Sequence, residues 1–214
     1  MYLPPQFKSL DLTNVCDLIK SHPFATLISN DDSGFPYITH LPLHLDIRPK
    51  DGNEPGLVLL GHVARPNLHW QYLRVRNLAL VSFLGPHAYM SPTVYPELAR
   101  VPTWNYLAVE CKVRATLIED PPSKDRLLKH LIADHEPSYA EQWRGLGEDF
   151  AQKMLAGIVA FELEVIDFQC KLKLNQHRAE SHRAMRAIYA NGNEDERELA
   201  QWMDRLGLDG SSKS

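Results

Sequence analysis

The sequence of 214 residues has few cysteines and no long apolar run. Cys16, Cys111 and Cys170 are odd in number and lie far apart, so they match neither a disulfide framework nor a zinc site. The mean hydropathy of -0.32 and the lack of an apolar segment of about 20 residues argue against a membrane-spanning helix. The first residues also lack the basic start and apolar core of a secretory signal. We therefore expect a cytoplasmic protein with no membrane partner.

The sequence also lacks the motifs of the common nucleotide, metal and nucleophile sites. It contains neither G-x-G-x-x-G nor G-x-x-x-x-G-K-[ST], and the nucleophile turn G-x-S-x-G is missing too. His40 and His44 share one predicted strand, but they would lie about 13 Å apart, too far to bind one metal ion. We therefore expect no metal site and assign no catalytic residue. A haem bound by a single histidine stays open, because an axial ligand needs no motif.

The charge of the chain does not favour binding to nucleic acid. The formal net charge is -4, and 44% of the residues are hydrophobic, which is enough for a sizeable core. From Lys171 to Arg186 the chain carries five basic residues against Glu180 alone, and an acidic stretch follows. We interpret this basic strip as the solvated face of two helices. DNA is the less favoured partner, because no helix-turn-helix pattern accompanies the strip.

Hydrophobic periodicity and turn residues predict strands joined by hairpins, with helices at the start, in the second half and at the end of the chain. The predicted strands span residues 24–29, 37–45, 57–63, 78–84, 103–117 and 158–168. Two helices are predicted to begin after the N-caps Asp11 and Ser123, and a short helix is predicted in the second part of the segment 64–73. Three more helices are predicted over residues 148–156, 179–190 and 194–206. Segments 48–56 and 86–101 are predicted to be irregular. This pattern favours an α+β protein with an antiparallel β-barrel and added helices.

The segment from Gly61 to Asn67 has the composition of a phosphate site. A buried strand ends near Gly61, Arg65 follows, and Asn67 is predicted to start a short helix. Amides at a helix N-terminus and a guanidinium both bind phosphate oxygens. The same residues also fit a surface arginine beside an ordinary N-cap, and their spacing alone favours neither interpretation.

Two aromatic segments could form a wall of a cleft for a flat ring. In residues 85–95, Tyr89 and Tyr95 stand among prolines that fix the backbone path, although a packed loop is the favoured interpretation. Trp104 and Asn105 open a predicted strand, where a ring can stack on a heteroaromatic ligand and an amide can hydrogen-bond to it. Residues of these types are more often part of a core or an interface.

Taken together, six segments resemble the PaiB-type family of FMN-binding split-barrel proteins, relatives of the pyridoxamine-phosphate oxidase group. The segments are MYLPPQF at 1–7, THLP at 39–42, GHVARPN and HW within 61–70, GPHAYMSP at 85–92, VPTWNY at 101–106 and KLNQHR at 173–178. They follow one another in the family order over most of the chain. The last segment departs from the family's usual KLSQNR, because Asn175 and His177 replace a serine and an asparagine.

The resemblance implies an antiparallel split barrel in residues 1–175, a helical extension in 176–214, and a homodimer with FMN at the subunit interface. It places residues 38–41 along the isoalloxazine ring and residues 62–67 around the phosphate, with further contacts from the neighbouring subunit. The implied cofactor-binding residues are Ile38, Thr39, His40, Leu41, Gly61, His62, Ala64, Arg65, Asn67, Ser91, Trp104, Asn105 and Gln176.

The resemblance also implies a function, that of a negative transcriptional regulator. An FMN-dependent oxidoreductase acting on a small substrate is the alternative, because bound FMN itself carries redox chemistry. A haem-binding split barrel is the third and less favoured interpretation. Fold alone does not choose among the three.

Overall fold

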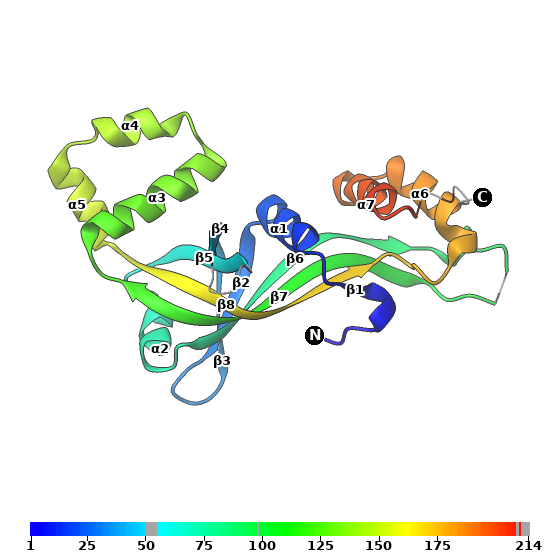
Figure 1. The fold of residues 1–214 in the computed structure, drawn as a ribbon, viewed down its shortest axis with the longest axis horizontal. Coiled ribbons are helices and arrows are strands. Elements are labelled where there is room, and N and C mark those ends of the chain that lie inside the picture. Colours follow the sequence, from blue (N-terminus) through cyan, green and yellow to red (C-terminus); the bar gives the residue numbers. More distant parts are fainter. Residues whose placement is uncertain (50–54, 98, 209, 211–214) are drawn as a thin grey trace. The chain divides into compact units, whose positions relative to one another are not determined.

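The computed structural model describes residues 1–49, 55–97, 99–208 and 210 and contains both strands and helices (Figure 1). The strands are β1 (Lys8–Ser9), β2 (Phe24–Asn30), β3 (Pro36–Pro42), β4 (His44–Pro49), β5 (Pro55–Ala64), β6 (Leu78–Met90), β7 (Thr103–Ile118) and β8 (Ile158–Lys173). The α-helices are α1 (Leu12–Ser21), α2 (His69–Val75), α3 (Pro121–His135), α4 (Tyr139–Gly145), α5 (Glu148–Ala156), α6 (His182–Ala190) and α7 (Glu194–Arg205). Short 3-10 helices cover Pro5–Phe7, Pro92–Val94 and Ala179–Ser181.

The strands form one sheet in the order β3-β2-β6-β7-β8-β5-β4, and β1 pairs with β8. The pairs β2–β3, β2–β6, β4–β5, β5–β8 and β1–β8 are antiparallel. Antiparallel neighbours can be joined by short turns, as between β2 and β3. The predicted α+β class, with an antiparallel sheet, peripheral helices and a helical C-terminus, is confirmed.

The chain forms two compact units, and each unit contains part of the long strands β6, β7 and β8. The first unit consists of Met1–Leu18, Leu84–Val109 and Gln169–Ser214, and the second unit consists of Ile19–Phe83 and Glu110–Phe168. The division into residues 1–175 and 176–214 that the sequence suggests stays a prediction.

The β2–β3 hairpin of the second unit follows from its turn residues and its burial pattern. The carboxylate of Asp31 accepts a hydrogen bond of 2.8 Å from the amide of Ser33, and Gly34 has a φ of 86°. Alternate residues of β2 are buried, and the register places Ala25 opposite Leu41. Because β3 lies at one end of the strand order, the predicted ring contacts lie on an edge strand.

Helix α3 packs on β5 and β8 of the second unit. The shared apolar cluster consists of Val58, Leu60, Leu127, Leu131 and Ala160, with Ile118 packed against it. The helix begins at Pro121, two residues before the predicted N-cap Ser123, because Asp120 caps it by accepting a bond of 2.8 Å from the Ser123 amide. The prediction of Ser123 as the cap was wrong, since proline suits the first turn, where no intrahelical N–H is needed. Helix α4 was not predicted.

Two segments predicted as irregular continue strands instead. β6 runs to Met90, beyond the predicted end at Leu84, although it includes Pro86. The pairing of β6 with β2 covers Leu80 to Ser82, so the missing N–H of Pro86 removes no bond from that ladder. β4 and β5 extend into the predicted loop 48–56, and residues 50–54 of that loop lie outside the described residues. The predicted strand 37–45 is divided into β3 and β4.

Helices α6 and α7 of the first unit pack against each other, in orange and red in Figure 1. α7 begins with a capping box, in which Asn193 Oδ1 accepts from the Glu196 amide at 3.0 Å and Glu196 Oε2 accepts from the Asn193 amide at 2.7 Å. On α6, Met185 and Tyr189 are fully buried. The two predicted terminal helices are therefore confirmed, although the 3-10 helix Ala179–Ser181 precedes α6.

Candidate functional site

The predicted cofactor-binding residues fall into two groups, one in each unit. The group in the second unit, on β3, β5 and the turn after β5, is Ile38, Thr39, His40, Leu41, Gly61, His62, Ala64, Arg65 and Asn67. The group in the first unit is Ser91, Trp104, Asn105 and Gln176.

Within the second unit, hydrogen bonds connect β3 to the turn after β5. Asn67 Nδ2 donates to Thr39 Oγ1 at 3.2 Å, and His69 Nδ1 lies 2.8 Å from the same oxygen. Asn67 Oδ1 accepts from the backbone amide of His69 at 3.0 Å and from the Tyr37 hydroxyl at 3.4 Å. The fold therefore brings two predicted site residues, Thr39 and Asn67, into direct contact.

His69 supports this contact from inside the protein. Its side chain has no exposed surface, and its ring meets the ring of Tyr37 edge-on at 5.2 Å. Burial lowers the pKa of His69 to about 4, so the imidazole is neutral at neutral pH. Neither His69 nor Tyr37 was predicted as a site residue. The available signal was weak: Tyr37 shares a strand face with Thr39, and His69 follows Asn67 by two positions.

Arg65 lies exposed at the end of β5 and contacts the start of β8. Its Nε donates to the carbonyl of Ala156 at 2.7 Å, and its Nη2 donates to the carbonyl of Ile158 at 3.3 Å. An arginine has five N–H groups, so these two bonds leave others for an anion. Lys124 Nζ donates to the same Ile158 carbonyl at 3.3 Å, which brings a second cation to this corner.

Lys124 was not predicted, because it lies on α3, far from Arg65 in the sequence. It is buried, and this burial, followed by the charge of Arg65, lowers the pKa of its ammonium. Two cations at one corner repel each other, and an anion bound there would relieve the repulsion. The corner therefore suits a phosphate monoester.

The predicted helix N-terminus does not contribute to this corner. α2 begins at His69 rather than Asn67 and is seven residues long. The Arg65 amide donates to the Gly157 carbonyl at 2.9 Å, and the Asn67 amide donates to the Ala64 carbonyl at 2.9 Å. Both amides therefore already have carbonyl acceptors, one in a distant segment and one in the local turn, and the prediction that helix-terminal amides bind the phosphate stays a prediction. The phosphate prediction depends on the side chains.

The two faces of β3 differ in exposure. Ile38 and His40 lie on the exposed face, and His40 stacks on Phe24 with ring centres 6.4 Å apart. Leu41 is buried, so only its backbone could meet a ligand. An exposed apolar and aromatic strip on an edge strand can pack against a flat ring.

The three predicted site residues of β5 differ in how they are packed. A Cβ atom on Gly61 would lie 2.4 Å from Leu43 Cδ2, so a glycine lets the buried Leu43 approach the strand. His62 is half-buried, and burial lowers its pKa. Its Nδ1 is buried and has no hydrogen-bond partner among the residues that the structure describes. A bound ligand could supply that partner. Ala64 is exposed at the strand end.

In the first unit, the predicted residues differ in accessibility. Trp104 is half exposed, and its ring lies 6.3 Å from that of Tyr89. Ser91 caps the 3-10 helix Pro92–Val94. Gln176 Oε1 accepts from the Leu174 amide at 3.0 Å. Asn105 has no exposed surface, so its predicted contact with a flavin stays a prediction.

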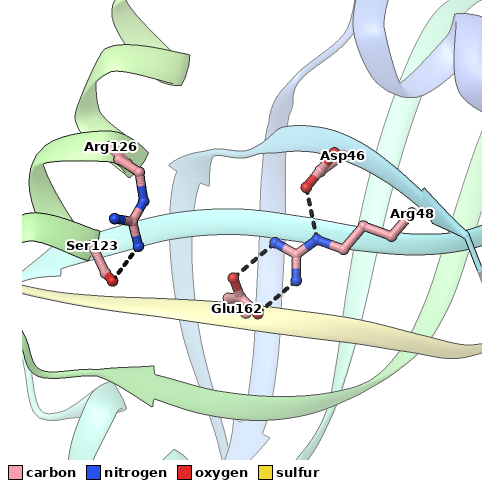
Figure 2. A network of polar contacts seen from close by, with 5 residues as sticks. All are labelled: Asp46, Arg48, Ser123, Arg126 and Glu162. Carbon is pink, nitrogen blue, oxygen red and sulfur yellow. Dashed lines mark hydrogen bonds and ion pairs between the residues drawn. The ribbon is translucent and has the colours of Figure 1, made fainter.

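A second polar arrangement in the second unit lines a pocket of about 220 Å³ (Figure 2). Arg48 Nη1 and Nη2 donate to the two carboxylate oxygens of Glu162 at 2.9 and 2.8 Å, and Nε donates to Asp46 at 2.8 Å. Arg126 in the same pocket donates to Ser123 Oγ at 2.6 Å. Because the carboxylates of Asp46 and Glu162 neutralise the positive charge of Arg48, we do not expect this guanidinium to bind an anion. We assign no ligand to this pocket.

Other classes of site are absent from the part of the chain that the structure describes. In those residues no group of three or more histidine, cysteine or acidic side chains is placed to hold a metal ion. No described helix is long and apolar enough to cross a membrane. The three cysteines, all within the described ranges, are buried and form no disulfide. Burial raises the pKa of Cys170 to about 12, which disfavours its reactive thiolate.

Comparison with known proteins identifies relatives in sequence and in fold. The family model described as "Putative FMN-binding domain" matches residues 1–167. Protease synthase and sporulation protein PAI 2 of Bacillus subtilis (strain 168) is 33% identical over 186 residues, which cover 85% of this chain and 84% of the relative.

Two solved structures share the fold at low sequence identity. The flavocytochrome Anf3 from Azotobacter vinelandii matches with a TM-score of 0.58 and 16% identity, over 79% of this chain and 70% of that chain. The FAD and heme binding protein from Mycobacterium smegmatis matches with a TM-score of 0.51 and 20% identity, over 78% of this chain and 73% of that chain. These likenesses concern the fold alone, and the predicted split-barrel fold is confirmed.

Proposed function

Because the chain belongs to this FMN-binding family and FMN is its cofactor, we propose that it is a PaiB-like negative transcriptional regulator whose activity depends on bound FMN. The relative that supports this role is named a protease synthase and sporulation protein, and it aligns with most of the chain. The compartment that fits a transcriptional role is the cytoplasm.

The observation that carries the cofactor site is the corner formed by Arg65 and Lys124. Both cations donate to the carbonyl of Ile158, and the guanidinium lies at the surface. A dianionic phosphate would gain charge-assisted hydrogen bonds there. In this proposal the exposed face of β3, with Ile38 and His40, packs along the isoalloxazine ring. The bound FMN supplies a redox-active ring, and the protein orients it.

The proposed active form is a homodimer with FMN at the subunit interface. Its support lies in the first unit, where Trp104 is 50% exposed and Tyr89 is 51% exposed on neighbouring strands. Exposed aromatic residues of this kind are enriched in protein interfaces. In the dimer, Trp104 of the partner subunit approaches the flavin.

Direct recognition of DNA by the basic strip is not part of the proposal. Lys171 is 6% exposed, and Arg186 is paired with Asp204 at 2.5 Å. Arg178 lies 4.0 Å from Glu180. Burial and ion pairs with acidic residues of the same chain therefore reduce the positive electrostatic potential that this strip would offer to a DNA backbone. We propose that the regulation depends on the bound flavin.

The first experiment identifies the chromophore and the activity together. The purified protein should show a flavin spectrum, and mass analysis of the released chromophore should give FMN. Anaerobic mixing with NADH or NADPH should leave the flavin oxidised, and a gel shift at low salt should show no binding to DNA. Rapid bleaching by either nicotinamide would favour the oxidoreductase, and a Soret band would favour haem binding.

A further inference from the structure

We propose that a further cavity, between the end of α1, β4 and the end of α3, binds a small organic carboxylate. The cavity has a volume of about 540 Å³, and its lining residues belong to the second unit. It is distinct from the corner of Arg65 and Lys124, because Lys124 and the lining residue Asp134 lie about 15 Å apart along the axis of α3. The inference does not depend on bound FMN.

The floor of this cavity is apolar. Leu43 and Leu45 are buried, and the Leu43 amide donates to the carbonyl of Pro23, another lining residue, at 3.0 Å. Pockets of a few hundred Å³ that combine apolar walls with a few placed polar groups are typical of small-molecule sites. The floor therefore suits the hydrocarbon part of a ligand.

The rim of the cavity carries two basic side chains, Lys20 and His135. Both are exposed, and neither side chain has a hydrogen bond or an ion pair within the described part of the chain. The acidic residue of the lining is Asp134, which is already bonded to His44. Lys20 therefore keeps an uncompensated positive charge at the rim, and an anion would gain a charge-assisted hydrogen bond there.

Asp134 orients the imidazole of His44 toward a ligand. His44 Nδ1 lies 2.6 Å from Asp134 Oδ2, and an ionised carboxylate can only accept, so Nδ1 carries a proton. Nε2 is then the ring nitrogen left for a ligand. The ring also stacks on His130 with centres 4.8 Å apart, and the His44 side chain is only 19% exposed. His44 is therefore a fixed polar group at the edge of the apolar floor.

An anion at Nε2 favours the protonated form of His44, in which both ring nitrogens donate. The other charged or titratable groups around this ring are Lys20 on α1, Asp46 on β4, and His130, Asp134 and His135 on α3. Histidine changes its charge in the physiological pH range, whereas a ligand carboxylate stays ionised there. Binding should therefore take up a proton, and affinity should rise as the pH falls from about 8 to about 6.

The combination of an apolar floor and a basic rim selects the class of ligand. Inorganic phosphate would leave the surface of Leu43 and Leu45 without an apolar partner. An amine would meet the ammonium of Lys20, and like charges repel. A monoanion with a hydrocarbon part uses both the floor and the rim.

The main test titrates the full-length protein with benzoate and hexanoate, and in parallel with benzamide and inorganic phosphate. Calorimetry gives the affinities, and NMR shifts locate the ligand. We expect a carboxylate to shift the signals of His44 and Leu45 and to bind about 10-fold more tightly than benzamide or phosphate. The proposal is overturned if neither carboxylate binds, if benzamide binds equally well, or if the shifts are confined to the corner of Arg65 and Lys124.

A pair of lysine variants separates ligand binding from compensation of a helix end. Lys20 lies in the last turn of α1 and Lys153 in the last turn of α5, and both are exposed. A lysine in either place interacts favourably with the helix dipole. Lys20→Met should weaken benzoate binding about 5- to 10-fold, and Lys153→Met should leave it unchanged. Equal benzoate affinity of the two folded variants would show that Lys20 only compensates its helix and would overturn the proposal.

The role of His44 is tested by the pH profile of benzoate affinity. His44→Gln cannot titrate, so it should lose most of the increase between about pH 8 and pH 6. His130→Gln is the matched control, because His130 stacks on His44 but does not line the cavity. The control should keep the pH profile. An unchanged profile in folded His44→Gln would overturn the assignment of His44 to the ligand. Thermal unfolding shows whether each variant is folded.

Discussion

The side-chain amide of Asn105 on β7 donates a hydrogen bond of 2.9 Å to the phenol oxygen of Tyr189 on α6, 84 positions later in the chain. Both side chains have no exposed surface, and burial raises the pKa of the Tyr189 hydroxyl. The family match ends at residue 167, so this bond connects a strand inside the match to a helix outside it. Helix α6 thereby fixes the side chain of Asn105, a residue of the predicted flavin site, by a hydrogen bond.

The bond between Asn105 and Tyr189 should contribute measurably to stability. Tyr189→Phe removes the oxygen acceptor of the buried Asn105 amide, which keeps only the weak acceptor Met185 Sδ at 3.3 Å, and we expect a cost of about 1–3 kcal/mol of unfolding free energy. Urea or thermal unfolding measures this difference. The matched control is Tyr2→Phe, because Tyr2 is 84% exposed and its hydroxyl should contribute less than about 0.5 kcal/mol. Equal effects of the two substitutions would contradict the structural role of Tyr189.

Arg65→Ala should distinguish the contribution of the phosphate to FMN binding from the contribution of the rest of the flavin. We expect FMN affinity to fall about 10- to 100-fold, because a charge-assisted hydrogen bond contributes about 1.5–3 kcal/mol. Riboflavin, which lacks the phosphate, should lose little affinity. Fluorescence titration of both ligands measures the ratio. An equal loss for FMN and riboflavin would refute a phosphate role for Arg65.

Lys124→Met should also weaken FMN binding, by about 10-fold, because it removes the second cation of the corner while keeping an apolar stem. The matched control is Lys129→Met on the same helix, since Lys129 pairs with Asp125 and is half exposed. The control should leave FMN affinity unchanged. If both variants bind FMN as the unaltered protein does, Lys124 is a structural lysine only.

His69 should make stability depend on pH in a defined window. Its pKa is about 4 in the folded protein and about 6.5 when unfolded, so the unfolded chain binds one more proton between these values. The contribution of neutral His69 to the free energy of unfolding is therefore complete above pH 6.5. It is lost as the pH falls toward 4, by at most about 1.4 kcal/mol per pH unit.

The comparison that isolates this group is His69→Gln, which cannot titrate. Unfolding free energies of the two proteins, measured from pH 7 to pH 4.5, should show a flatter curve for the variant. Carboxylates and His62 titrate in both proteins and cancel in the difference. Parallel curves would mean that His69 is not buried in its neutral form.

Local patterns predicted several elements correctly because their causes are local. Asp31 and Gly34 specify a turn by their own backbone chemistry, and the burial pattern of β2 follows the period of a strand. The helix predicted over 194–206 also has a local cause, since the capping box that starts α7 involves only the four residues from Asn193 to Glu196. Sequence reasoning failed where packing overrides propensity, as in the continuation of β6 through Pro86.

The candidate site was only partly predictable. The segment around Arg65 was identified from its composition, but the sequence did not show that the Arg65 amide donates to the distant Gly157 carbonyl and the Asn67 amide to the Ala64 carbonyl. Lys124 could not be found, because its approach to Arg65 depends on how α3 packs against β8. His69 was also missed, since its burial results from neighbours on β3 and α2 rather than from its own sequence context.

The sequence by itself determined the family, the FMN cofactor, the order of most strands and helices and the residues from which a phosphate corner could be built. Tertiary structure alone decided that Thr39 meets Asn67 and His69, that Lys124 joins Arg65, and that Tyr189 holds Asn105. The physical reason is that turn and cap preferences act over a few neighbouring residues, whereas hydrogen bonds between distant segments exist only after strand register and helix packing have brought them together.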